Sequence, residues 1–316
     1  MPLKAPADKL PLAVRKNVRD EWESKKSEIE ARISKTLGEA WTVTTNPNLL
    51  YVYTDDESYK SRIGTIIMWY MEPFCSNLES FVATYGDDGK SELNTLCPKH
   101  QVELAPQEDD TKFTYGGLQI KDGVLRLLFA EGYLAANVSD VSRDFNDALT
   151  KAAAAGGGAG SSGSGSSSAF NINARQSVRE SYDPKVADLQ QAIGALVGVP
   201  DILLNANFEA NAAVLAAAGA QVRADWDRIL GRVSLDYFDG LKYQLERAGF
   251  KDDDMLQEGF QEAVTKREIL LRVVDKLQKG TYHEVLVEDG VLVIQTTPGY
   301  LWSNVSDVGS EILDIL

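Results

Sequence analysis

The polar residues best suited to chemistry form one set that occurs twice in the chain. In each half a tyrosine is followed by asparagine, serine and aspartate at the same spacing. The set comprises Tyr133, Asn137, Ser139 and Asp140 in the first half and Tyr300, Asn304, Ser306 and Asp307 in the second. An aromatic wall with amide and hydroxyl groups could bind a ligand or a protein partner. In the simpler interpretation, each serine caps a final short helix and each aspartate lies in its first turn.

Other candidate catalytic groups are sparse. His100 and His283 are the only two histidines, and the repeat places no histidine opposite either of them. A zinc site needs several such ligands at short spacing, so we expect no metal site. Cys75 and Cys97 fit small core residues better than nucleophiles. We therefore predict no cofactor, and the sequence identifies no catalytic residues.

Two further motifs have a structural interpretation. Residues 88–91 read Asp-Gly-Lys-Ser, but Thr84 stands where a phosphate-binding loop needs its first glycine, so we predict a solvated turn. The acidic clusters at 55–57, 109–110 and 252–254 lack the ligand spacing of a calcium loop. We expect these carboxylates to cap helices and turns.

The overall charge limits the classes of partner. Lys plus Arg number 32 against 47 Asp plus Glu, a net charge of −15. Such a chain repels phosphate backbones and anionic membranes, so we expect neither nucleic acid nor membrane as a partner. No secretory signal or bilayer-spanning apolar stretch is evident, and two cysteines imply no disulfide framework. These features favour an intracellular, cytoplasmic protein.

An internal repeat dominates the sequence. Residues 99–141 align without a gap with 266–308, at an offset of 167, and 17 of the 43 pairs are identical. A weaker match, at an offset of 160, relates residues 18–38 to 178–198. Repeats of this kind indicate one structural unit used twice. We therefore predict a tandem duplication.

A Gly/Ser-rich stretch separates the two halves. We assign repeat unit 1 to residues 1–150, a flexible linker to 151–170 and repeat unit 2 to 171–316. The composition of residues 152–168 is compatible with a natural linker and with an engineered tether between related subunits. We favour the natural linker, because designed linkers are usually more regular.

Periodicity predicts an α+β fold in each unit. Apolar stripes indicate amphipathic helices over 14–37 and 63–74, and over 178–197 and 222–245. Short strands are expected at 41–44 and 49–53. Asp-Gly pairs at 122–123 and 289–290 lie between β-rich runs, which predicts a three-stranded antiparallel meander in each unit. We expect two-layer units that pair about a pseudo-twofold axis, which would protect open strand edges.

These observations favour a non-catalytic binding or assembly protein, built as an intramolecular pseudo-dimer. Its partner would be a protein or a small ligand, and the two units would associate with each other. The alternative is a small-molecule enzyme with its site at the interface between the units. A deep pocket lined by Tyr133 or Tyr300 beside an ionisable group of perturbed pKa would favour the enzyme, whereas a flat apolar face would favour a protein partner.

Overall fold

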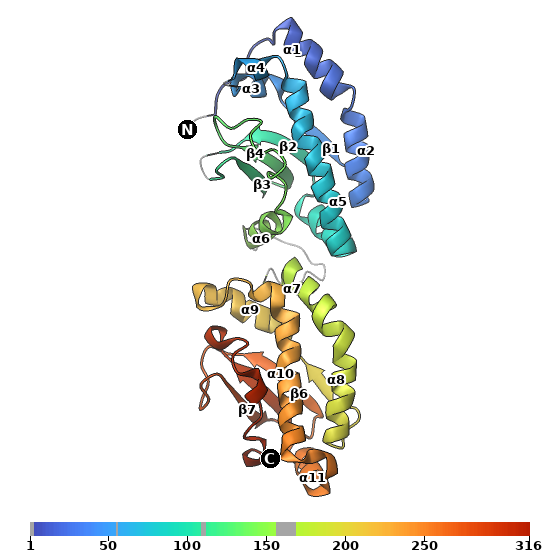
Figure 1. Ribbon diagram of the computed structural model, residues 1–316, viewed down its shortest axis with the longest axis vertical. Helices are drawn as coiled ribbons and strands as arrows, with labels where there is room; N and C mark the ends of the chain where they lie inside the picture. The colour runs from blue at the N-terminus through green and yellow to red at the C-terminus, as the bar shows by residue number, and fades with distance from the viewer. Residues whose placement is uncertain (1–2, 55, 109–111, 156–168) are drawn as a thin grey trace. The chain divides into compact units, whose positions relative to one another are not determined.

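A computed structural model describes residues 3–54, 56–108, 112–155 and 169–316 (Figure 1). The chain forms two compact units, Met1–Gly160 and Ser161–Leu316, here called unit 1 and unit 2. Each combines helices with a four-stranded mixed sheet, as expected for an α+β protein. No helix in the described part of the chain is long and apolar enough to cross a bilayer.

Unit 1 begins with the predicted amphipathic helix. It consists of α1 (Leu12–Asn17), a π-helical turn (Val18–Glu23) and α2 (Lys26–Leu37), and it ends at Gly38 with φ of 81°. That left-handed conformation is accessible to glycine at little cost, which explains the stop. The elements that follow are β1 (Thr42–Thr45), α3 (Pro47–Val52), α4 (Glu57–Lys60), α5 (Ile63–Leu96), β2 (Gln101–Pro106), β3 (Gly116–Lys121), β4 (Val124–Phe129) and α6 (Phe145–Ala155).

Unit 2 follows a similar order with more helical turns. Its elements are α7 (Ile172–Ser177), a π-helical turn (Val178–Tyr182), α8 (Asp183–Leu196), β5 (Leu203–Asn205), α9 (Phe208–Ala218), α10 (Trp226–Ala248), α11 (Asp254–Ala263), β6 (Glu268–Val273), β7 (His283–Glu288) and β8 (Val291–Thr296). Short 3₁₀ turns lie at Gly219–Gln221, Phe250–Asp252, Pro298–Tyr300, Val305–Asp307 and Ile312–Asp314.

The prediction of an antiparallel meander was wrong in part. The Asp-Gly hairpins are present: β3 and β4 are antiparallel, as are β7 and β8, and Asp122 and Asp289 have φ of 53° and 50°. However, β2 pairs with β4 in parallel, and β6 pairs with β8 in parallel. The strand orders are β1-β2-β4-β3 and β5-β6-β8-β7. In each sheet the last strand in the chain lies in the interior, and the strand before it in sequence pairs with its outer side. Strand β3 or β7 therefore forms an outer edge.

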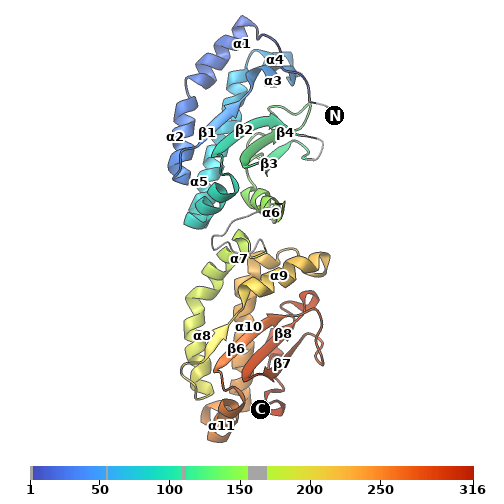
Figure 2. The same ribbon diagram turned by 180° about the vertical axis from the view of Figure 1, so that it is seen from behind.

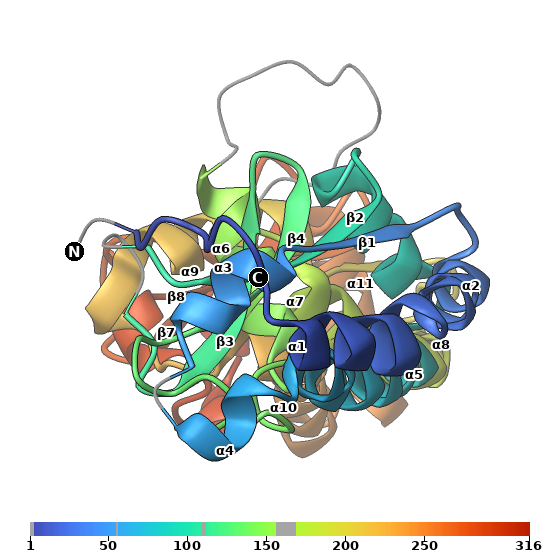
Figure 3. The same cartoon turned by 90° about the horizontal axis from the view of Figure 1, so that it is seen from above.

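One helical layer covers one face of each sheet. Helices α2 and α5 lie behind the sheet of unit 1, and α8 and α10 behind that of unit 2, when viewed as in Figure 2. Figure 3 shows α1 beside α5. The predicted stripe on α5 is buried, including Ile63, Ile66 and Tyr70. Alternate residues of β2 and β4, such as Val102 and Leu125, are buried as well.

The helices approach each other closely where glycine occurs. A Cβ atom on Gly64 of α5 would lie 2.4 Å from the carbonyl oxygen of Asn17. On Gly231 of α10 it would lie 2.3 Å from the carbonyl oxygen of Ser177. Both positions therefore require glycine for the helix crossing.

Three local predictions need correction. Residues 49–53 were expected to form a strand, but residues 49–52 belong to α3 and Tyr53 follows its end, because Asn46 caps the amide of Leu49 and Pro47 occupies the first turn. Residues 88–91 were expected to form a turn but are helical within α5, after an irregular residue at Gly86. Residues 151–155 of the predicted linker form the end of α6, and residues 156–168 lie outside the described part of the chain.

Candidate functional site

The repeated polar set lies in the loops that follow β4 and β8, and its tyrosines are exposed. Tyr133 is 44% exposed and Tyr300 42%. Each ring makes an edge-to-face contact with a second exposed tyrosine. The centroid of Tyr133 lies 5.1 Å from that of Tyr115, and the centroid of Tyr300 lies 5.2 Å from that of Tyr282. We call these contacts the tyrosine pairs.

The loops are fastened to the long helices by equivalent hydrogen bonds. The backbone N–H of Ala135 donates to the hydroxyl of Tyr70 on α5 at 3.1 Å. In unit 2 the N–H of Trp302 donates to the hydroxyl of Tyr237 on α10, also at 3.1 Å. Both hydroxyls are buried, and burial raises the pKa of Tyr70 to about 12. These tyrosines therefore remain neutral and position the loops.

A second pair of contacts holds the same loops further along. The side-chain amide of Asn77 donates to the carbonyl of Ser139 at 3.2 Å. The amide of Gln244 donates to the carbonyl of Ser306 at 2.6 Å. The long helix of each unit thus holds the loop at two points. Tyr133 and Tyr300 therefore belong to loops that are anchored to a helix.

The remaining members of the repeated set shape the loop. Asn137 and Asn304 have φ of 48° and 50°, a left-handed conformation that asparagine tolerates better than most residues. The backbone carbonyl of Asn137 accepts from the N–H of Asp140, which closes a turn. The same bond links Asn304 and Asp307. Turn formation therefore accounts for both asparagines.

The predicted capping role of the serines was wrong. The hydroxyl of Ser139 donates to the carboxylate of its neighbour Asp140. Helix α6 begins only at Phe145, and Asp144 accepts from the N–H of Asp147 in its first turn. In unit 2, Ser306 lies inside the 3₁₀ turn Val305–Asp307, and its hydroxyl also donates to the neighbouring aspartate. A further helix starts too far downstream for either serine to cap it.

Each unit also holds a tryptophan with an arginine over its ring. In unit 1 the guanidinium of Arg62 lies 5.0 Å from the ring of Trp69, which belongs to α5. In unit 2 Arg223 lies 5.2 Å from the ring of Trp302, which belongs to the loop itself. The indole N–H of Trp302 donates to Asp236, the residue that stands 167 positions after Trp69. The tryptophan that faces the arginine thus comes from α5 in unit 1 and from the loop in unit 2.

A groove of about 690 Å³ adjoins the tyrosine pair of unit 2. Its wall includes Tyr282, His283, Asn304 and Asp307, together with the start of β7 and residues 309–311 and 314–315. The Nε2 atom of His283 lies 3.1 Å from the carbonyl oxygen of Asn304. Burial lowers the pKa of His283, and the nearby Asp307 opposes this shift. The ring is thus held against the loop.

Glu284 also lines this groove. Burial alone would raise the pKa of its carboxyl group. The backbone N–H groups of Gln278, Lys279 and Gly280 donate to the carboxylate at 2.8–3.3 Å and hold the pKa below its usual value. The carboxylate therefore pins the segment that precedes β7.

A larger groove in unit 1, of about 1000 Å³, follows α1 and the π-helical turn. It is lined by apolar residues such as Leu10 and Leu12 and by basic residues such as Lys9 and Arg15. None of its lining residues belongs to the repeated segment 99–141.

The thiols and the acidic clusters have structural positions. Cys75 and Cys97 are buried, and burial raises their thiol pKa to about 11 and about 12, so thiolate is scarce at neutral pH. Asp56 caps α4 and Asp253 caps α11, as predicted for the acidic clusters. The cluster at 109–110 falls outside the described part of the chain. Among the described residues, no three His, Cys, Asp or Glu side chains are grouped to hold a metal.

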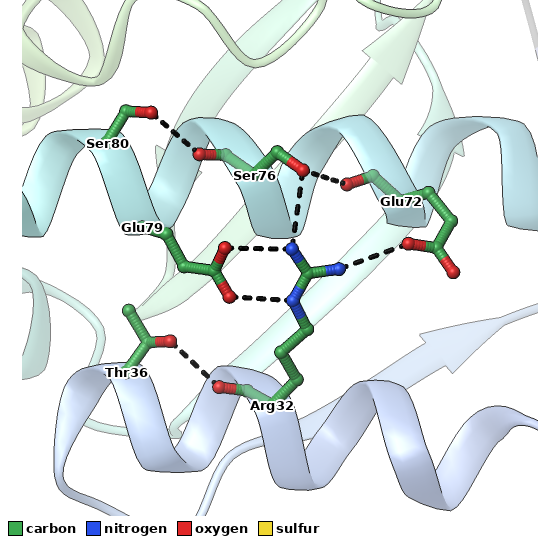
Figure 4. Close-up of polar contacts among 6 residues, drawn as sticks. All are labelled: Arg32, Thr36, Glu72, Ser76, Glu79 and Ser80. Atoms are coloured by element: carbon green, nitrogen blue, oxygen red, sulfur yellow. Dashed lines mark hydrogen bonds and ion pairs between the residues drawn. The ribbon is translucent and has the colours of Figure 1, made fainter.

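An ion-pair network joins α2 to α5 (Figure 4). The guanidinium of Arg32 donates to both carboxylate oxygens of Glu79, at 2.7 and 2.8 Å, and to Glu72 at 3.1 Å. The side-chain hydroxyl of Ser76 also accepts from it. The hydrogen bond from Arg32 holds the pKa of Glu79 below its usual value. Both carboxylates are paired with Arg32, so we assign this network to the packing of α2 against α5 and not to catalysis.

Searches against protein-family models, curated proteins and solved structures found no match for the chain. The site is therefore characterised from its own geometry. Tyr115 and Tyr282 were part of the repeated sequence, but only the fold brings them against Tyr133 and Tyr300. The stacked arginines lay outside the aligned segments, so the repeat gave no indication of them.

Proposed function

We propose that this protein is a non-catalytic binding or assembly protein that docks a protein partner through the tyrosine pairs. The observation that carries the proposal is the recurrence of one exposed edge-to-face contact, Tyr115 with Tyr133 and Tyr282 with Tyr300. All four rings are between 41% and 44% exposed. Tyrosine supplies a large contact area and a polar tip, and it is enriched at the centres of protein interfaces.

The surroundings of the tyrosine pairs support a protein partner. Each unit also holds a tryptophan with an arginine over its ring, and in unit 2 this tryptophan belongs to the loop itself. Both residue types are enriched among binding hot spots. The loop is held by two bonds from the neighbouring helix, so little conformational entropy would be lost on binding.

We further propose that the two units are duplicated copies that associate as a pseudo-dimer. The identical strand orders, the recurrence of the tyrosine pairs and the matching loop contacts support the duplication. Chemical cross-linking of the monomeric full chain, read by mass spectrometry, tests the association. Reproducible cross-links between the units are expected. Cross-links confined to single units would contradict the pairing.

Partner capture with tyrosine variants tests the binding proposal. The purified full chain is compared with Tyr133→Ala, Tyr300→Ala, the double variant and Tyr243→Ala. Tyr243 is 52% exposed and belongs to neither tyrosine pair, so its variant is the matched control. A partner recovered from extract is purified and its Kd measured against each variant. Each single variant should weaken binding, and the double variant should weaken it at least tenfold more, because two linked surfaces bind with avidity. Equal affinity for all variants would sink the proposal.

A small-molecule enzyme is the competing hypothesis. His283, with its lowered pKa, lies in a groove with Asp307, which is the observation in its favour. Native mass spectrometry of freshly purified protein separates the two. A stoichiometric small molecule that is lost in His283→Asn would favour the enzyme, and a retained protein would favour the binding proposal.

A further inference from the structure

Strand β7 is an outer edge whose backbone groups alternate between paired and unpaired. Among the described residues, its one neighbouring strand is β8. The turn at Asp289 and Gly290 has φ of 50° and 77°, as in a two-residue hairpin, so the flanking pair Glu288 and Val291 is hydrogen-bonded. Hydrogen-bonded and non-hydrogen-bonded pairs alternate along an antiparallel ladder. Val287 and Val285 are therefore non-hydrogen-bonded positions, and their N–H and C=O groups point away from β8.

Unit 1 gives an independent check on this alternation. The N–H of Ala130 donates to the carbonyl of Tyr115 at 2.8 Å, one step beyond the last pair of β3 and β4. Tyr115 stands 167 residues before Tyr282, and the two hairpins share the same register. Within residues 169–316, the outward backbone groups of Val285 and Val287 have no hydrogen-bond partner.

The groove beside this edge is acidic. It runs along β7 from His283 to Leu286 and is lined by Glu284, Asp307, Glu311 and Asp314 against one lysine, Lys279. Glu284 is already bound to three backbone amides. Glu311 and Asp314 are exposed and make no ion pair within residues 169–316. An open strand edge beside unpaired carboxylates is complementary to an extended, positively charged chain.

We propose that β7 binds an extended basic peptide segment of a protein partner, which adds to the sheet as a fifth strand. The peptide backbone pairs with Val285 and Val287, and its Lys or Arg side chains meet Glu311 and Asp314. This inference rests on the proposed function, because Tyr282 and Asp307 border the same groove. It concerns unit 2 alone, since α6 packs against β3 in unit 1.

The test uses the full chain and a fluorescein-labelled heptapeptide of alternating Lys and Val. Fluorescence anisotropy gives its Kd, and a Glu-Val peptide of the same length is the charge control. Two further Lys-Val peptides carry N-methyl groups on odd or on even residues. Only one of these sets removes the N–H groups that face β7. One isomer should therefore bind at least tenfold more weakly than the parent, and the other should retain most of its affinity.

Protein variants locate the site. Val285→Pro removes one outward N–H group and leaves the hydrogen bonds with β8 in place. It should weaken peptide binding at least tenfold. The double variant Glu311→Lys/Asp314→Lys should do the same, whereas Glu28→Lys/Glu258→Lys, with an equal change in charge at exposed sites elsewhere, should not. Circular dichroism and Tm confirm that each variant is folded, and the charge variants test the site even if the proline variant unfolds.

Three results would overturn the inference. They are equal binding of both N-methyl isomers, equal loss in the two charge-reversal variants, and absence of peptide binding to wild type. A wild-type dimer that dissociates in Val285→Pro, with no peptide bound, would assign the edge to a second copy of this chain instead. If tyrosine-dependent partner binding persists in any of these cases, only the basic-peptide inference fails. If it is lost while the peptide still binds, only the tyrosine proposal fails.

Discussion

The hydroxyl of Tyr237 accepts a hydrogen bond from the backbone N–H of Trp302, 65 residues further along the chain. The same hydroxyl donates to the side-chain oxygen of Thr296 at 3.0 Å. One buried oxygen thus connects α10, the last strand and the loop that carries Tyr300.

Removing that oxygen should destabilise unit 2. Tyr237→Phe leaves the partner groups of Trp302 and Thr296 without their bonds, so we expect a loss of about 1–3 kcal/mol in the free energy of unfolding. Tyr70→Phe, which removes the one corresponding bond to Ala135, should cost less. Urea unfolding of both variants measures the difference. An equal cost at the two positions would contradict the extra role of the bond to Thr296.

Replacing Gly231 by alanine should disturb the crossing of α10 with α7. The new Cβ atom would lie 2.3 Å from a backbone oxygen, so the helices must separate, at a cost of about 1–3 kcal/mol. Gly259 of α11 is the matched control, because nothing lies within 4 Å of its Cβ position. Gly259→Ala should be neutral or stabilising, since alanine favours helix. Thermal unfolding of the two variants tests this prediction, and destabilisation of both to the same degree would contradict it.

Glu284 should make the stability of unit 2 depend on pH. Its pKa is lowered in the folded state, so its contribution is fully present above the unfolded pKa, about 4.3, and is lost as the pH falls through the folded pKa. Glu284→Gln should therefore be less stable than wild type at pH 7, and the gap should close in acid.

Hydrogen exchange gives a second readout of Glu284. Residues 278–280 should exchange faster in Glu284→Gln at pH 7, because their N–H groups lose a charged acceptor. The exposed Glu258→Gln serves as the control and should leave these amides unchanged. Unaltered exchange in Glu284→Gln would show that the carboxylate does not pin the segment.

The Arg32 network should contribute little to stability. Its guanidinium and the carboxylate of Glu79 are 32% and 44% exposed, so solvent screens the pair. Arg32→Lys keeps the charge and loses the two-pronged contact, and we expect a loss of about 0.2–1 kcal/mol that shrinks at high salt. Arg19→Lys, at an exposed pair with its neighbour Asp20, is the control. A salt-independent loss would contradict the electrostatic origin.

Local pattern predicted the opening helix of each unit, the first part of α5 and the Asp-Gly hairpins, because each depends on nearby residues. The apolar stripe on α5 follows from the spacing of neighbouring residues along the helix. The positive φ angles of the hairpin turns follow from the Asp-Gly pairs themselves. The parallel pairing of β2 with β4 was missed, because strand order is decided by packing between distant segments. Residues 49–53 were misassigned, because their β-rich composition was given more weight than the capping Asn46 and Pro47.

The candidate site was predictable only in part. Repetition identified Tyr133 and Tyr300, whereas their ring partners became evident only when the loops were seen beside the edge strands. The serines were assigned to caps, because a serine followed by an aspartate resembles the start of a helix. In unit 1 the chain instead forms a tight turn at Asn137, and α6 begins only at Phe145.

The different locations of Trp69 and Trp302 have a consequence for comparisons between the two units. Trp69 stands opposite Asp236, and Trp302 stands opposite Ala135, so a column-by-column comparison would rate both sites as variable. Yet each unit holds an indole with a guanidinium over its ring. Relatives of this chain are better sought by the location of side chains in space than by residue identity at aligned positions.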